Sequence, residues 1–176
     1  MKKEYGKALR QLFAKRMQDE WPLFRETKVK TIYLFPGERA FLWVVSEQLY
    51  CWVVLSPSPK DYDQFTLLIG WSMLGRYPEL NAIPSTRFPS ADHEEFTEQE
   101  YLIRLPMLWT DKDPWWVVRK FKPARNNQDL LAQVAPIAPQ QAIAQVMPRV
   151  DEALEKLRSH GIPYLRAFIN SQKPGN

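Results

Sequence analysis

The stretch RAFLWVVSEQLYCWVVLSPSPKDYDQFTLLIGWS, residues 39–72, predicts three consecutive β-strands. Its three apolar runs, Arg39–Gln48, Leu49–Ser56 and Phe65–Ser72, are rich in the β-branched and aromatic residues that suit a pleated surface. A short polar break at residues 46–48 favours an antiparallel hairpin between the first two runs. Pro57 and Pro59 end the second run because proline cannot donate to a central hydrogen-bond ladder.

The third run predicts that the two faces of the sheet differ. Side chains alternate between the faces of a strand, so the odd and even positions of residues 65–72 form separate rows. The odd row is entirely apolar and the even row is mixed: Phe65, Leu67, Ile69 and Trp71 against Thr66, Leu68, Gly70 and Ser72. This pattern is typical of a sheet that is covered on one face and partly open on the other.

Two amphipathic helices are expected to provide the cover. Lys3–Glu20 carries an apolar stripe at three- and four-residue steps. Gln140–His160 shows the same period, with Pro148 inside it, and we expect Gly161 to cap this helix and Pro163 to end it. Further strands are predicted at Val29–Phe35, Tyr101–Leu105 and Trp115–Phe121, and a short helix is predicted at Asp129–Val134.

These elements predict an α+β fold. We expect a mainly antiparallel, twisted sheet of five or six strands, with the N-terminal and C-terminal helices packed on one face. The length of 176 residues suits a single domain over residues 1–176, with residues 1–2 and 171–176 frayed. Residues 73–89 form a long irregular segment, a type of loop that is often functional.

The composition indicates a cytoplasmic protein without a membrane partner. Cys51 is the single cysteine, so no intramolecular disulfide can form. The basic start of the chain is not followed by the apolar region of a secretory signal. No apolar run is long enough to cross a bilayer.

The charge distribution favours another protein, or a second copy of the chain, as partner. The net charge is +4, but the N-terminal 30 residues are mostly basic and residues 89–113 are mostly acidic. Separated charges of both signs suit a protein partner or self-association, and they disfavour a nucleic-acid backbone.

No motif defines a reaction. The glycines are scattered, so phosphate-binding loops are excluded, and two histidines with one cysteine cannot form a zinc cluster by themselves. We therefore predict no catalytic residue, cofactor or metal site. One enzymatic alternative remains, because Glu26-Thr27-Lys28 matches the acid-x-lysine element of metal-dependent nucleases, although the strands that follow it up to Ser72 supply no further carboxylate.

The candidate partner-binding residues lie in two segments. Trp115 and Trp116 are adjacent on a predicted strand, so their side chains should point to opposite faces. An outward tryptophan beside Arg119 has the chemistry of an interface hot spot. The second segment lies within the acidic residues 89–113. The predicted site comprises Trp115, Trp116, Arg119, Asp92, Glu94 and Glu95.

The chain also resembles a loose group of uncharacterised bacterial proteins known as domains of unknown function. The resemblance rests on FLWVVSEQLYCWVVL (residues 41–55), FTLLIGWS (65–72) and the helix RVDEALEKLRSHGIPYL (149–165), following an N-terminal amphipathic helix. It implies a bacterial cytoplasmic α+β domain and assigns no functional residue. Some small domains of this build are immunity proteins that neutralise a toxin, which is an analogy of fold.

Three functions remain open at this point. The favoured one is a non-enzymatic protein-interaction domain, for example one of the immunity type. The alternatives are a metal-dependent hydrolase or nuclease around Glu26, and a small-ligand-binding domain that uses the open face of the sheet. A deep apolar pocket with convergent polar groups would favour the ligand-binding alternative.

Overall fold

The computed structural model describes residues 1–60, 63–79, 87–112, 114–120 and 123–173, apart from the side chains of residues 130 and 132–134. Six antiparallel strands form one sheet. Neighbouring strands follow chain order: β1 (Arg25–Thr27), β2 (Arg39–Val44), β3 (Tyr50–Pro57), β4 (Gln64–Ser72) and β5 (Glu100–Arg104). The short β6 (Trp116–Val117) pairs with the beginning of β4, on the edge that β5 occupies further along.

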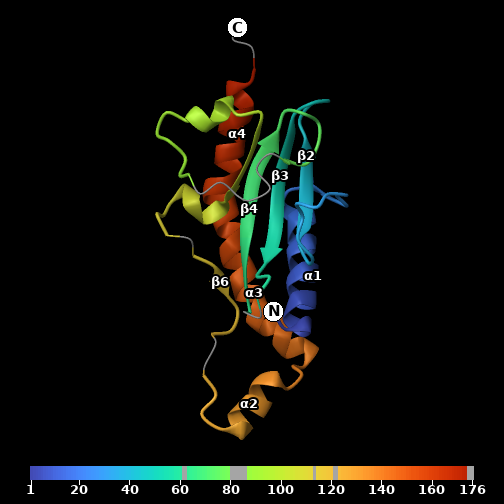
Figure 1. Cartoon of the computed structure of the whole chain (residues 1–176). Helices are drawn as coiled ribbons and strands as arrows, with labels where there is room; N and C mark the ends of the chain where they lie inside the picture. Colours follow the sequence, from blue (N-terminus) through green and yellow to red (C-terminus); the bar gives the residue numbers. More distant parts are fainter. Residues whose placement is uncertain (61–62, 80–86, 113, 121–122, 174–176) are drawn as a thin grey trace.

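Helices cover one face of this sheet (Figure 1). They are α1 (Lys3–Glu20), α3 (Pro139–Lys156), a π-helical turn (Leu157–Gly161) and α4 (Ile162–Ser171), whereas α2 (Asn127–Val134) projects beyond the sheet. Short 3-10 helices occur at Glu94–Thr97 and Leu105–Leu108. In the described part of the chain, no helix is both long and apolar enough to span a lipid bilayer.

The main core lies between the helices and the sheet. The four apolar odd positions of β4, Phe65, Leu67, Ile69 and Trp71, are fully buried. The Trp71 ring stacks between Phe168 of α4 and Tyr101 of β5, at centroid distances of 3.8 and 4.8 Å. The predicted α+β fold and its covered face are therefore confirmed, and α1 has the predicted bounds.

The predicted strand at Val29–Phe35 is wrong. The first strand is instead β1, which pairs Arg25 with Leu42 and Thr27 with Ala40. Residues 28–38 leave the sheet edge and fold over the face opposite the helices, where Tyr33 packs against the second apolar cluster. The amide of Phe35 donates a hydrogen bond to the Glu38 carboxylate. Val29 and Leu34 also pack against the second apolar cluster, whereas Ile32 is exposed, so the apolar alternation is not that of a strand.

The predicted end of the C-terminal helix is also wrong, because helical structure continues to Ser171. Gly161 has φ −68° and ψ −49°, so it is helical and does not cap. A Cβ at Gly161 would lie 2.9 Å from Leu105 Cδ1, so this glycine allows close packing against the Leu105–Leu108 turn. The π-helical turn before Pro163 accommodates the missing amide donor of the proline.

The last predicted strand, Trp115–Phe121, is much shorter than expected. Only Trp116 and Val117 pair with β4, because Val117 lies opposite Gln64, the first residue of β4, and the chain then runs past the start of that strand. Phe121 lies outside the described residues. The short helix predicted at Asp129–Val134 is present as α2, beginning two residues earlier, where the Asn126 side chain accepts a hydrogen bond from the Asp129 amide.

Gly70 is a position where the sheet tolerates no side chain, which yields a test of the fold. A Cβ there would lie 1.9 Å from the Tyr101 carbonyl oxygen on β5. We expect Gly70→Ala to lower the free energy of unfolding by at least about 3 kcal/mol, because backbone must move. Urea unfolding followed by circular dichroism measures this loss. Gly6→Ala is the matched control, since only the flexible Arg10 side chain lies nearby, and it should be neutral or stabilising by up to about 1 kcal/mol.

Candidate functional site

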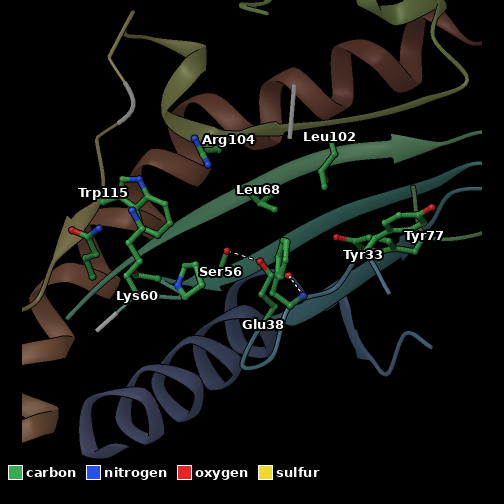
Figure 2. Close-up of a pocket in the computed structure, with 13 residues that line it drawn as sticks. Tyr33, Glu38, Ser56, Lys60, Leu68, Tyr77, Leu102, Arg104 and Trp115 are labelled. Atoms are coloured by element: carbon green, nitrogen blue, oxygen red, sulfur yellow. Dashed lines mark hydrogen bonds between the residues drawn. The ribbon is translucent and has the colours of Figure 1, made fainter. Parts of the chain in front are cut away.

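A pocket lies on the face of the sheet that the helices leave uncovered (Figure 2). The second apolar cluster, built around Trp52, Leu68 and Leu102, forms its surroundings. The pocket has a volume of about 350 Å³, within the range of small-molecule sites. We name it the open-face pocket, and it is lined by Tyr33, Phe35, Glu38, Ser56, Ser58, Pro59, Lys60, Gln64, Leu68, Tyr77, Leu102, Arg104 and Trp115.

A buried carboxylate, Glu38, forms one wall of the pocket. Its side chain accepts hydrogen bonds from the Ser56 hydroxyl at 2.5 Å and from the Phe35 amide at 2.8 Å. The residue is only 8% exposed, and no ion pair to it occurs among the described residues. Burial raises the pKa of the Glu38 carboxyl, and the two hydrogen bonds oppose this effect only in part.

The register of the strands extends this wall into a polar row. Ser56 on β3 lies opposite Thr66 on β4, and the hydrogen bond between Glu38 and Ser56 continues the row past the beginning of β2. The Thr66 hydroxyl is 1% exposed and has no hydrogen-bond partner within the described structure. An unsatisfied buried hydroxyl is costly, and Thr66 lies beside the pocket without lining it, whereas Ser56 lines the pocket.

Positive charge lies at the opposite side of the pocket. The Arg104 guanidinium, at the end of β5, sits 5.6 Å from the centroid of the Trp115 ring. The exposed Lys60 lies in the connection between β3 and β4, and its side chain lies beside Trp115 in Figure 2. Tyr33 and Tyr77 lie at the other end of the view, with Glu38 and Ser56 between. The pocket therefore has an aromatic end, a central carboxylate and a basic end.

Tyr77 connects the aromatic end to the rest of the open face. Its ring packs edge-on against Trp52 at a centroid distance of 5.2 Å, and the Trp52 indole donates to the Arg76 carbonyl oxygen. Burial, and then the negative charge of Glu38, raise the pKa of the Tyr77 hydroxyl far above its ordinary value. The Tyr77 hydroxyl therefore stays protonated near neutral pH.

The structure separates the two tryptophans of the predicted partner site. Trp116 faces the helices, is 7% exposed and stacks on Phe65 at 5.7 Å. Trp115, the residue before β6, lines the open-face pocket on the opposite face of the sheet. Arg119 forms an ion pair with one carboxylate oxygen of the buried Asp63. The other oxygen accepts a hydrogen bond from the backbone amide of Lys2 at 2.7 Å. Arg119 thus helps to hold the N-terminus and β6 together.

The acidic part of the predicted partner site also divides into buried and exposed residues. Asp92 and Glu94 are exposed. Glu95 is 4% exposed and accepts hydrogen bonds from the Tyr164 hydroxyl and the Ser90 amide. Although burial acts to raise it, these hydrogen bonds hold the pKa of the Glu95 carboxyl below its ordinary value. Glu95 thus serves the internal packing of α4, and partner binding at the exposed residues stays a prediction.

The other candidate chemical groups lie away from the pocket. Glu26 is on the edge strand β1, where it pairs with Arg39 at 2.8 Å. Among the described residues, no group of three His, Cys, Asp or Glu side chains could hold a metal ion. Cys51 is buried in the main core, where burial raises the pKa of its thiol to about 12, so the thiol stays protonated.

Sequence reasoning anticipated an open face but not its central residue. Glu38 follows Pro36-Gly37 and looks like part of a turn, and its partner Ser56 looks like the end of a strand. One signal was available, because Glu38 directly precedes an apolar strand. A carboxylate that such a strand carries into the protein must gain hydrogen bonds or an ion pair, and such groups often mark a site. Tyr77 gave no sequence signal, because it lies in an aperiodic loop.

The chain matches no family model, no curated protein and no solved structure. The geometry of the open-face pocket is therefore the basis for its proposed function.

The buried Glu38 carboxyl predicts a specific pH dependence of stability. Because the pKa is raised in the folded state, the neutral carboxyl stabilises that state, and this contribution is lost as pH rises from the ordinary value of 4.5 through the folded pKa. Glu38→Gln cannot ionise, and it keeps both contacts when its Oε1 accepts from the Phe35 amide and its Nε2 donates to the Ser56 hydroxyl. We expect its melting temperature to exceed that of the wild type at neutral pH, with the difference shrinking at pH 4.

Thermal unfolding from pH 4 to pH 8 measures this difference. The control is Glu94→Gln, which removes a carboxylate from an exposed position. A Glu38→Gln variant that is less stable than the wild type at neutral pH would show that the carboxylate is compensated within the protein.

Proposed function

We propose that the protein binds a small organic molecule with an apolar body in the open-face pocket. The observation that carries this proposal is the pocket's combination of aromatic and aliphatic walls with a few converging polar groups, notably Glu38 and Ser56. Pockets that bind small molecules have this composition, in which apolar surface supplies affinity and a few polar groups set orientation.

The architecture supports the proposal in a second way. The floor of the pocket is regular sheet, since Ser56, Leu68 and Leu102 belong to β3, β4 and β5. The walls come from connecting segments that carry Tyr33, Tyr77 and Trp115. A rigid floor with walls built by loops preorganises a site and lowers the entropy lost on binding.

We propose protein binding as a second candidate function. In this role the chain is a bacterial cytoplasmic interaction domain, for example of the immunity type, with another protein or a second copy as partner. The exposed Asp92 and Glu94, within an acidic segment, support an electrostatic contact. Such contacts are weakened by salt, because a Debye length at physiological ionic strength is about 8 Å.

The ligand-binding function is tested by a fragment screen on the whole protein, read by ¹H–¹⁵N NMR. We expect bound fragments to shift the amides of residues that line the pocket, with Leu68 and Leu102 among them. Trp115→Ala removes one wall and should weaken binding about tenfold, the loss expected for an aromatic contact.

The matched control is Trp109→Ala. This tryptophan is also half-buried, but it stacks on His160 at 4.8 Å and does not line the pocket. It should leave fragment affinity unchanged. Fragments that bind elsewhere, or that bind Trp115→Ala as tightly as the wild type, would contradict a function in this pocket.

The protein-binding function is tested by affinity capture of the tagged protein from bacterial lysate at low and high salt. We expect one stoichiometric partner that is retained at low salt and released at high salt. The double charge reversal Asp92→Lys with Glu94→Lys should abolish its capture. Glu47→Lys, at an exposed position outside the acidic segment, is the control. Recovery of the chain alone would contradict this candidate function.

A further inference from the structure

We propose that the ligand of the open-face pocket is an amino acid, or a close amino-acid derivative, with an apolar side chain. Its ammonium group would bind Glu38, its carboxylate would face Lys60 and Arg104, and its side chain would pack at the aromatic end. This inference rests on the proposed ligand-binding function and specifies the chemical class of the ligand.

The ammonium position follows from the hydrogen bonding of Glu38. An ionised carboxylate has about four lone-pair positions, and the described donors, the Ser56 hydroxyl and the Phe35 amide, occupy two of them. No cation pairs with this buried group among the described residues. A ligand ammonium would supply the missing positive charge and up to three donors, and charge-assisted hydrogen bonds are the strongest of their kind.

The Ser56 hydroxyl lines the pocket and offers a further acceptor to the same group. The Thr66 hydroxyl lies opposite Ser56 in the β3–β4 register and lacks a hydrogen-bond partner in the described structure. Thr66 is not among the residues that line the pocket, so an ammonium group at Glu38 would donate to the Ser56 hydroxyl as well as to the carboxylate. A ligand with a hydroxyl in place of the ammonium would leave the carboxylate without a counter-charge.

The carboxylate position follows from the basic end of the pocket. Lys60 and Arg104 line the same cavity as Glu38, and a ligand that carried only positive charge would be repelled by them. β5 lies on the far side of β4 from β3, so Arg104 and Glu38 approach the pocket from opposite sides. A zwitterion can satisfy both sides at once.

The side-chain position follows from the aromatic end. Tyr33 and Tyr77 lie together in Figure 2, beyond Glu38 as seen from Lys60, and Leu102 lies on the sheet near them. The order along the pocket is therefore apolar surface, carboxylate and positive charge. An apolar amino acid presents the complementary groups, namely side chain, ammonium and carboxylate.

Three matched compounds test the inference: L-phenylalanine, L-phenyllactate, which has a hydroxyl in place of the ammonium, and phenethylamine, which lacks the carboxylate. Calorimetric titration of the whole protein measures each affinity. We expect L-phenylalanine to bind at least about tenfold more tightly than either analogue, because each analogue lacks one charge-assisted contact.

Two variants assign the groups. Glu38→Gln should reduce the preference for phenylalanine over phenyllactate to about twofold or less, while phenyllactate affinity stays close to that of the wild type. Lys60→Gln should reduce the preference for phenylalanine over phenethylamine. Glu94→Gln is the control and should alter neither preference. Near-ultraviolet circular dichroism verifies that each variant is folded.

The outcomes separate this inference from the proposed function. Equal affinities for phenylalanine and phenyllactate, or discrimination that survives in Glu38→Gln, would overturn the ammonium contact. If none of the three compounds binds while fragments of other chemistry occupy the pocket, the amino-acid class is wrong and the ligand-binding function stands. If neither these compounds nor any fragment binds there, both proposals fail.

Discussion

The alternation of side chains along β4 is the constraint on which the rest of the structure depends. This strand pairs with β3 on one edge and with both β5 and β6 on the other. Its odd positions, from Phe65 to Trp71, are buried beneath the helices, so its even positions must form the opposite face. A shift of one residue in register would exchange the main core for the polar row that contains Thr66.

The two faces solve different physical problems. Helices cover the first face with continuous apolar packing around Trp71, which stabilises the domain. The second face is covered by connecting segments, which leave a cavity lined by both polar and aromatic groups. Glu38 lies in this second layer, where its burial opposes stability, and such a cost is typical of residues retained for binding.

Regular periodicity allowed most of the fold to be predicted from the sequence. The helix Lys3–Glu20 and the strands at the centre of the sheet have strong patterns, because their buried faces repeat at fixed spacing. The predictions failed where tertiary contacts override local signals. Val29–Phe35 alternates like a strand but packs across the open face, and Gly161 resembles a cap but allows contact with Leu105. The pocket itself was not predictable, since Glu38, Ser56 and Tyr77 meet only through strand register and loop packing.

The division of one edge of β4 between β5 and β6 has a consequence for how such a protein can change. The segment that joins these two strands begins beside Arg104 and ends beside Trp115, and both of these residues line the pocket. The buried Leu105–Leu108 turn at its start is fixed by the core, but the exposed part at Asp111 and Lys112 can vary in length and composition without altering any pairing within the sheet. Insertions in this connection would reshape the basic end while the polar row stays intact, so descendants of one ancestor could diverge in the molecules they select and still share a scaffold.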